Sequence, residues 1–239
     1  MTRDPATSFG ADVTAYDRGR PEYVDEHVAW LLDDVTGPVL DLGAGSGKLT
    51  RAVVRLGFDV TAVDPDEAML RANPASQSLV GTADRIPVPE ASAAAVVVGQ
   101  AWHWFDPDTA GPEIARVLQP TGRLGLIWNT RDTGDPFVAA LSEVAGPSPA
   151  EQMVDADAVR QVPGFAPFER RRWSRVRVMT APEVEAMITS RSAYLTAPEP
   201  EQRRLLAALR DLLAHHPHTA GRERFDYPLH TTVYRAAVL

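Results

Sequence analysis

Residues 39–48 read Val-Leu-Asp-Leu-Gly-Ala-Gly-Ser-Gly-Lys, a short apolar run that ends in three glycines at alternate positions. A helical pattern follows, in which Leu49, Ala52, Val53 and Leu56 fall on one face. This order predicts a buried strand, a tight turn and the start of a helix. Glycine takes positive φ freely and lets another molecule approach the backbone closely. We therefore expect the turn to hold a ligand at the carboxyl end of the strand.

The spacing of the glycines narrows the choice of ligand. A phosphate-binding P-loop is excluded because Leu49, which has no hydroxyl for Mg²⁺, follows Lys48, and because the leading glycine is missing. The dinucleotide pattern G-x-G-x-x-G fits in part, but Lys48 occupies its third glycine position. The remaining pattern, D-x-G-x-G-x-G, resembles the first motif of the class I S-adenosylmethionine-dependent methyltransferases. A structural glycine turn without a ligand stays open as the alternative.

An acidic residue ends the next predicted strand. Residues 58–64 form a second apolar run that closes on Asp64, seventeen positions after Gly47. A carboxylate at this point accepts hydrogen bonds from both ribose hydroxyls of an adenosine, in methyltransferases and in dinucleotide enzymes alike. The alternative is that Asp64 only caps a helix that starts near Asp66.

The resemblance implies further contacts to S-adenosylmethionine. A leader with tyrosines and arginines, residues 16–23, is similar to segments that fold over the cofactor in small-molecule methyltransferases; a surface arm packed by its tyrosines is the alternative. There an arginine would pair with the methionyl carboxylate, and a tyrosine ring would face the sulfonium. An acid at Asp84 would face the adenine amino group, unless it is a turn residue. The cofactor-binding residues implied in this way are Tyr16, Arg20, Asp41, Gly43, Ala44, Gly45, Gly47, Asp64, Pro65, Met69, Ala83, Asp84, Gln100 and Ala101.

The clearest buried strand, residues 93–99, is followed by Gln-Ala-Trp-His-Trp-Phe-Asp at 100–106. The Asn/Asp-Pro-Pro-Tyr motif of DNA amino-methylases is missing here, and Gln100 is not the acid that a metal-dependent catechol-type enzyme needs. The His-Trp-Phe sequence resembles methyltransferases akin to the trans-aconitate enzymes. We expect the methyl acceptor to meet Trp102, His103, Trp104 and Asn129, with His103 as the candidate catalytic base. Core packing of the two tryptophans and a structural role of His103 remain alternatives.

The resemblance implies an α/β fold: a Rossmann-like, seven-stranded, mostly parallel sheet with helices on both faces and an antiparallel C-terminal strand beside the fifth. We expect one domain over residues 1–239, with a cofactor-binding core at about 38–130 and a cap from about 1–36 and 133–220. Residues 133–167 show no strong periodicity and are expected to cover the acceptor.

Composition sets limits on partners. The 239 residues carry a formal net charge of −8 and no cysteine. The charge disfavours nucleic acid and anionic membranes, and the missing cysteines exclude disulfides and thiolate metal sites. Without an apolar leader or a membrane-length run, the protein is expected to be cytoplasmic. His215, His216 and His218 lack nearby acidic ligands, so no metal is expected. The oligomeric state is left open between monomer and homodimer.

These observations together predict methyl transfer from S-adenosylmethionine to a small-molecule acceptor, with oxygen favoured over nitrogen. A carboxylate acceptor needs no base, whereas a hydroxyl needs one. A catalytically silent cofactor-binding relative and a nicotinamide-dependent reductase remain the alternatives.

Overall fold

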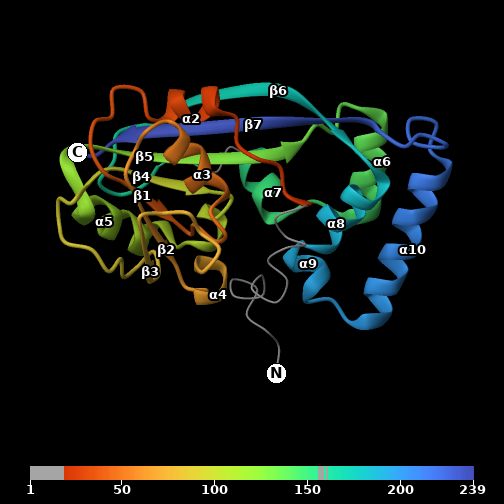
Figure 1. Ribbon diagram of the computed structural model, residues 1–239, viewed down its shortest axis with the longest axis horizontal. Helices are drawn as coiled ribbons and strands as arrows, with labels where there is room; N and C mark the ends of the chain where they lie inside the picture. Colours follow the sequence, from red (N-terminus) through yellow and green to blue (C-terminus); the bar gives the residue numbers. More distant parts are fainter. Residues whose placement is uncertain (1–18, 156–158, 160) are drawn as a thin grey trace.

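A single seven-stranded sheet runs through the molecule in the order β3-β2-β1-β4-β5-β7-β6 (Figure 1). The computed structural model describes residues 19–155, 159 and 161–239. Strands β1 to β5 pair in parallel, and β7 is antiparallel to both of its neighbours. The strands are β1 (Val39–Leu42), β2 (Val60–Asp64), β3 (Gln77–Val80), β4 (Ala93–Gly99), β5 (Leu118–Arg131), β6 (Glu169–Met179) and β7 (Phe225–Ala237). The predicted fold class is confirmed, including the antiparallel strand next to the fifth.

Helices cover both faces of the sheet because the central strands bury both of their faces. In β4, Val96 and Val98 join one apolar cluster with α5, whereas Ala95 and Val97 join a second cluster with α2 and α3. The helices of this part are α2 (Asp25–Leu31), α3 (Lys48–Arg55), α4 (Glu67–Leu70), η3 (Trp102–Trp104) and α5 (Pro107–Val117).

A second, mostly helical part extends past the ends of the long strands β5, β6 and β7 (Figure 1). Helices α6, α8 and α10 enclose an apolar cluster there together with the first residues of β7. The helices of this part are α6 (Pro136–Ala145), α7 (Pro149–Asp155), α8 (Ala181–Thr189), α9 (Ser192–Leu195) and α10 (Glu199–His215). None of the described helices is both long and apolar enough to cross a membrane.

The structure shows how the region expected to form the cap is built. Residues 133–167 contain α6 and α7, although they show little sequence periodicity; Asp135 caps α6 through hydrogen bonds from the backbone N–H groups of Phe137 and Val138. Two segments assigned to the cap belong to the sheet layers instead. Helix α2 packs against the sheet, and β6 is its edge strand.

The carboxyl ends of β1, β2, β4 and β5 meet at one edge of the sheet, because these neighbouring strands run parallel. The glycine turn follows β1, Asp64 ends β2, Gln100 follows β4, and Asn129 lies near the end of β5. The sheet therefore brings the predicted cofactor and acceptor residues to the same edge, facing the helical part.

Candidate functional site

The glycine turn is fixed against β2 by backbone hydrogen bonds. The N–H groups of Gly43 and Ala44 donate to the carbonyl of Val63 over 2.8 and 3.1 Å. Gly43 has a φ of +69°, and a Cβ there would lie 2.6 Å from the Cβ of Ala101. A glycine is required at this position by the backbone conformation and by the close approach of the segment after β4.

Asp64 is held directly opposite the turn. Its Oδ2 accepts a hydrogen bond from the backbone N–H of Gly45 over 2.9 Å, and its Oδ1 accepts one from the N–H of Asp66 over 2.8 Å. Burial raises the pKa of Asp64, whereas these two backbone donors lower it. Helix α4 is capped by Asp66, so capping does not explain Asp64. Each of its carboxylate oxygens keeps a lone pair for a hydroxyl donor.

Asp41, in the strand before the glycine turn, stabilises the turn through a buried hydrogen bond to α3. It is fully buried, and its Oδ2 accepts a hydrogen bond from the hydroxyl of Thr50 over 2.6 Å. Asn73 extends this network, because its Nδ2 donates both to Thr50 Oγ1 and to the carbonyl of Gly45. Burial raises the pKa of Asp41 to about 7, against the lowering effect of the Thr50 hydrogen bond.

A cavity opens between this edge of the sheet and the helical part. Most of the predicted site residues line it, namely Arg20, Gly43, Gly45, Asp64, Pro65, Met69, Gln100, Ala101, His103, Trp104 and Asn129. Asp41 and Ala44 line a smaller pocket that shares Arg20, Gly43, Gly45 and Gln100 with the cavity. The predicted cofactor and acceptor residues therefore meet in one space.

Four predicted contacts lie away from the cavity. Trp102 is 2% exposed and packs edge-on against Phe105 in the core, because the short helix η3 turns its ring into the sheet's apolar layer. Ala83 is also a core residue. Asp84 lies on the surface in the tight turn between Thr82 and Arg85, where a hydrogen bond from Thr82 lowers its pKa. Gly47 caps α3 and packs against Asn73 and Pro74.

Tyr16 lies outside the described residues, so its predicted contact is not placed.

Gln100 links the ends of β4 and β5. Its φ of +58° is rare for a residue with a side chain, and such conformations concentrate at functional sites. The side-chain Nε2 donates to the carbonyl of Asn129 over 2.7 Å. Asn129 Oδ1 accepts a hydrogen bond from Thr231 Oγ1, whereas its Nδ2 is buried without a partner among the described residues. Asn129 thus offers a donor at the cavity wall.

His103 is held as a neutral imidazole. Burial, followed by the nearby charge of Arg20, lowers its pKa to about 4. Its Nδ1 is buried without a hydrogen-bond partner in the described part of the chain, and its ring lies 4.8 Å from the ring of Trp104. A neutral His103 accepts a proton only weakly at neutral pH.

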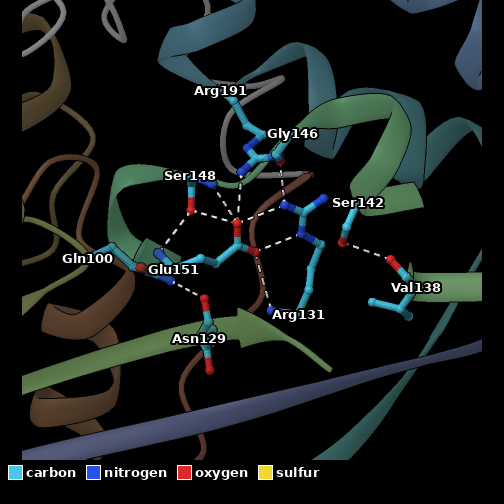
Figure 2. Close-up of polar contacts among 9 residues, drawn as sticks. All are labelled: Gln100, Asn129, Arg131, Val138, Ser142, Gly146, Ser148, Glu151 and Arg191. Carbon is cyan, nitrogen blue, oxygen red and sulfur yellow. Dashed lines mark hydrogen bonds and ion pairs between the residues drawn. The ribbon is translucent and has the colours of Figure 1, made fainter. Parts of the chain in front are cut away.

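An ion cluster that the sequence did not predict also lines this cavity. Figure 2 shows its polar contacts. Arg131 Nε donates to Glu151 Oε1 over 2.7 Å, and Arg131 Nη2 donates to Glu151 Oε2 over 2.7 Å. Arg191 Nη2 reaches the same Oε2 over 3.1 Å, and both arginines donate to the carbonyl of Gly146. Ser148 adds hydrogen bonds from its N–H and its hydroxyl to Glu151 Oε2.

The cluster keeps its charges although it is buried. Burial alone would raise the pKa of Glu151, but the hydrogen bonds and charges of Arg131 and Arg191 outweigh it and lower the pKa to about 2. Burial, together with the charge of Arg131, lowers the pKa of Arg191 to about 10. All three side chains are therefore ionised at neutral pH.

Three of these residues, Arg131, Ser148 and Glu151, left a signal in the sequence. Arg131 follows Asn129 by two positions in β5, so both side chains share a face of the strand. Ser148 and Glu151 have the S-x-x-E spacing of a capping box at the start of α7. Arg191 follows α8 without a comparable pattern, and only the fold brings it to the cluster.

The histidines at the end of α10 have structural partners. His218 Nε2 lies 2.8 Å from the carbonyl oxygen of Asp226, and the rings of His216 and His218 pack against Phe137. Among the described residues, no three His, Asp or Glu side chains are grouped in a way that could hold a metal ion.

Known proteins with similar sequences and folds are methyltransferases. A family model described as a methyltransferase domain matches residues 40–126. A methyltransferase of Mycobacterium tuberculosis whose activity is uncharacterized is 43% identical over 99% of this chain and 98% of its own length. A second one, from Schizosaccharomyces pombe, is 30% identical over 95% of both chains.

The solved structures agree on the fold. A candidate type II methyltransferase of Anaeromyxobacter dehalogenans superposes with a TM-score of 0.66 at 21% identity, covering 92% of this chain and 97% of that one. The YcgJ protein of Bacillus subtilis has a TM-score of 0.56 at 18% identity, with 90% and 99% covered. With the glycine turn, the sheet order and a close relative over its whole length, this chain belongs to the class I S-adenosylmethionine-dependent methyltransferase family.

Proposed function

We propose that this protein transfers the methyl group of S-adenosylmethionine to a small-molecule acceptor, and that the methylated atom is an oxygen. One observation carries the proposal: the glycine turn with Asp64 and the segment from His103 to Trp104 line the same cavity. A cofactor at the first and an acceptor at the second would therefore be in contact.

The residues around the turn fit an adenosine with a methionyl tail. Asp64 has free lone pairs for ribose hydroxyls, and the glycines at 43 and 45 place no side chain between the backbone and a ligand. Met69 and Ala101 supply apolar surface beside them. Arg20 lines the same cavity and offers a guanidinium for the methionyl carboxylate.

The bound cofactor would supply a methyl group on a sulfonium, which is a good leaving group, so the chain mainly has to align the acceptor and exclude water. The buried Nδ2 of Asn129 is a donor that can orient an acceptor oxygen. Because the pKa of His103 is lowered to about 4, its imidazole is a weak base. This favours an acceptor that needs little or no deprotonation, as a carboxylate does.

Methyl transfer can be tested without knowledge of the acceptor. The protein is incubated with methyl-labelled S-adenosylmethionine and a cell extract, and the label is then counted in the small-molecule, nucleic-acid and protein fractions. We expect label in the small-molecule fraction, and we expect Asp64→Ala to reduce it strongly at a cofactor concentration near the Kd of the wild type. Asp59→Ala is the matched control, because Asp59 is exposed and lies just before the first residue of the same strand, where it accepts a hydrogen bond from the Ser76 hydroxyl.

The outcomes separate the alternatives. Label only in nucleic acid or protein would contradict a small-molecule acceptor. No label in any fraction, from a protein that binds S-adenosylmethionine, would identify a catalytically silent relative instead.

A further inference from the structure

Two arginines share a single carboxylate at the acceptor end of the cavity. Arg131 and Arg191 both pair with Glu151, and the side chains are 7%, 11% and 13% exposed in that order. Both oxygens of Glu151 already accept hydrogen bonds, one of them from four donors. The two guanidiniums and the single carboxylate together carry a net charge of about +1, and Glu151 cannot balance it.

A third guanidinium lies near the cluster. Arg20 lines the same cavity, and its charge helps to lower the pKa of both Arg191 and His103, after the larger effect of burial. Arg20 therefore lies in the electrostatic reach of both side chains.

Two buried donors of this region are also left without acceptors in the described part of the chain. They are Nη1 of Arg131 and the hydroxyl of Tyr227, whose side chain is 3% exposed in β7. Both residues line the cavity. A buried donor that makes no hydrogen bond is costly, most of all on a charged group. An anionic ligand compensates the charge and offers acceptors.

We propose that the methyl acceptor carries a carboxylate, which the Arg131–Glu151–Arg191 cluster binds with the help of Tyr227. This inference rests on the proposed methyl transfer and names its substrate class. A carboxylate fits better than a phosphate, because a single negative charge balances the excess left by two guanidiniums and one glutamate. Its planar pair of oxygens also matches the fork of a guanidinium.

The competing explanation is structural. The same ion pairs attach the end of β5 to α7 and to the segment before α9, and they would do so whatever the cavity binds. A test must therefore distinguish ligand binding from stability.

The experiment measures melting temperatures with and without S-adenosylhomocysteine at constant ionic strength. Acetate, butyrate and benzoate are compared with acetamide, butyramide and benzamide, which have nearly the same shape but no charge. We expect the acids to raise the melting temperature and the amides to leave it unchanged. Arg191→Met should weaken acid binding by about tenfold or more, yet keep the shift from S-adenosylhomocysteine.

Arg210→Met is the matched control, because Arg210 pairs with Glu185 on the surface of the same helical part and is 62% exposed. It should keep both shifts. Should Arg191→Met fail to fold, Tyr227→Phe removes only a hydroxyl and should weaken acid binding by about twofold to tenfold.

Equal shifts from acids and amides, no shift from any of the three acids, or an undiminished acid shift in Arg191→Met would each overturn the carboxylate proposal. A missing shift with S-adenosylhomocysteine would instead contradict the proposed function. The acids therefore test the carboxylate proposal, and S-adenosylhomocysteine tests the proposed function.

Discussion

Two regions of the cavity wall surround a buried carboxylate in opposite ways. One holds the glycine turn and Asp64, where we propose that the cofactor binds (the cofactor end); the other is the Arg131–Glu151–Arg191 cluster, where we propose that the acceptor binds (the acceptor end). At the cofactor end, Asp64 receives hydrogen bonds from the backbone N–H groups of Gly45 and Asp66. At the acceptor end, Glu151 is surrounded by the guanidiniums of Arg131 and Arg191. The first end is negatively charged and suited to hydroxyl donors, whereas the second carries a positive excess and is suited to an anion.

The pKa values show the same contrast. Burial raises the pKa of Asp64, and it raises the pKa of Asp41 to about 7. Glu151 is also buried, but its arginine partners outweigh burial and lower its pKa to about 2. Burial alone does not set the charge of a carboxyl group; the donors around it decide.

The largest expected effect is on the acceptor end. Glu151→Gln leaves two buried guanidiniums without their carboxylate and should lower the free energy of unfolding by about 3–5 kcal/mol. Glu185→Gln is the matched control; its partner Arg210 lies on the surface, and the loss should be only about 0–1 kcal/mol. Urea denaturation of both variants measures the difference. Similar losses in the two would contradict the account of the cluster.

The ion pairs of Glu151 also predict a pH dependence of the free energy of unfolding. Because the pKa of Glu151 falls from 4.5 to about 2 on folding, its contribution is complete above pH 4.5 and is lost as the pH falls towards 2. The stability difference between the wild type and Glu151→Gln should therefore shrink over this window. A difference that stays constant down to the lower limit would show that ionised Glu151 is not its source.

The next effect is on the cofactor end. Asp64→Ala removes a charged acceptor for ribose hydroxyls and should weaken S-adenosylhomocysteine binding by about tenfold or more. Titration calorimetry measures this affinity, with Asp59→Ala as the control from the opposite end of the same strand. Unchanged affinity in Asp64→Ala would show that the Asp64 carboxylate only stabilises the glycine turn and does not bind the cofactor.

The two ends also differ in how far the sequence predicts them. The cofactor end is local: the glycine turn and Asp64 lie in residues 43–64, where strand periodicity and glycine spacing are readable. The acceptor end joins Arg131, Glu151, Arg191 and Tyr227, which no local pattern connects. Their meeting depends on the packing of the helical part against β5 and β7.

The predicted contacts that do not line the cavity show the same dependence on tertiary packing. The strand before the glycine turn, the strand that ends at Asp64 and the strand at residues 93–99 were predicted close to their observed positions, because burial on both faces leaves a continuous apolar run. Trp102 was expected at the cavity and lies in the core, since the direction of a ring in η3 depends on its tertiary neighbours. Asp84 was expected at the adenine and lies on the surface of a turn.

The smallest expected effect concerns His103, which lines the same cavity. Its pKa is about 4 in the folded protein and 6.5 in the unfolded chain. Between these two pH values the unfolded chain therefore binds a proton that the folded protein does not. Stability should therefore fall as the pH drops from 6.5 towards 4, and His103→Gln should flatten this slope. His215→Gln, at a side chain that is 76% exposed, is the control.

Activity gives a second test of His103. Methyl transfer should be nearly independent of pH between about 6 and 8, because the imidazole stays neutral throughout this range. A rate that rises with pH through a midpoint near 6.5 and loses this step in His103→Gln would show that His103 titrates normally and acts as a base.

The central claim is that the glycine turn and Asp64 bind S-adenosylmethionine, and the most direct test is the melting temperature with its product. S-adenosylhomocysteine at about a hundredfold excess over its Kd should stabilise the protein by about 2.7 kcal/mol. For a domain of this size the shift is about 5–11 °C. NADH and NADPH should produce none. A shift from either nicotinamide nucleotide, with none from S-adenosylhomocysteine or S-adenosylmethionine, would contradict the account.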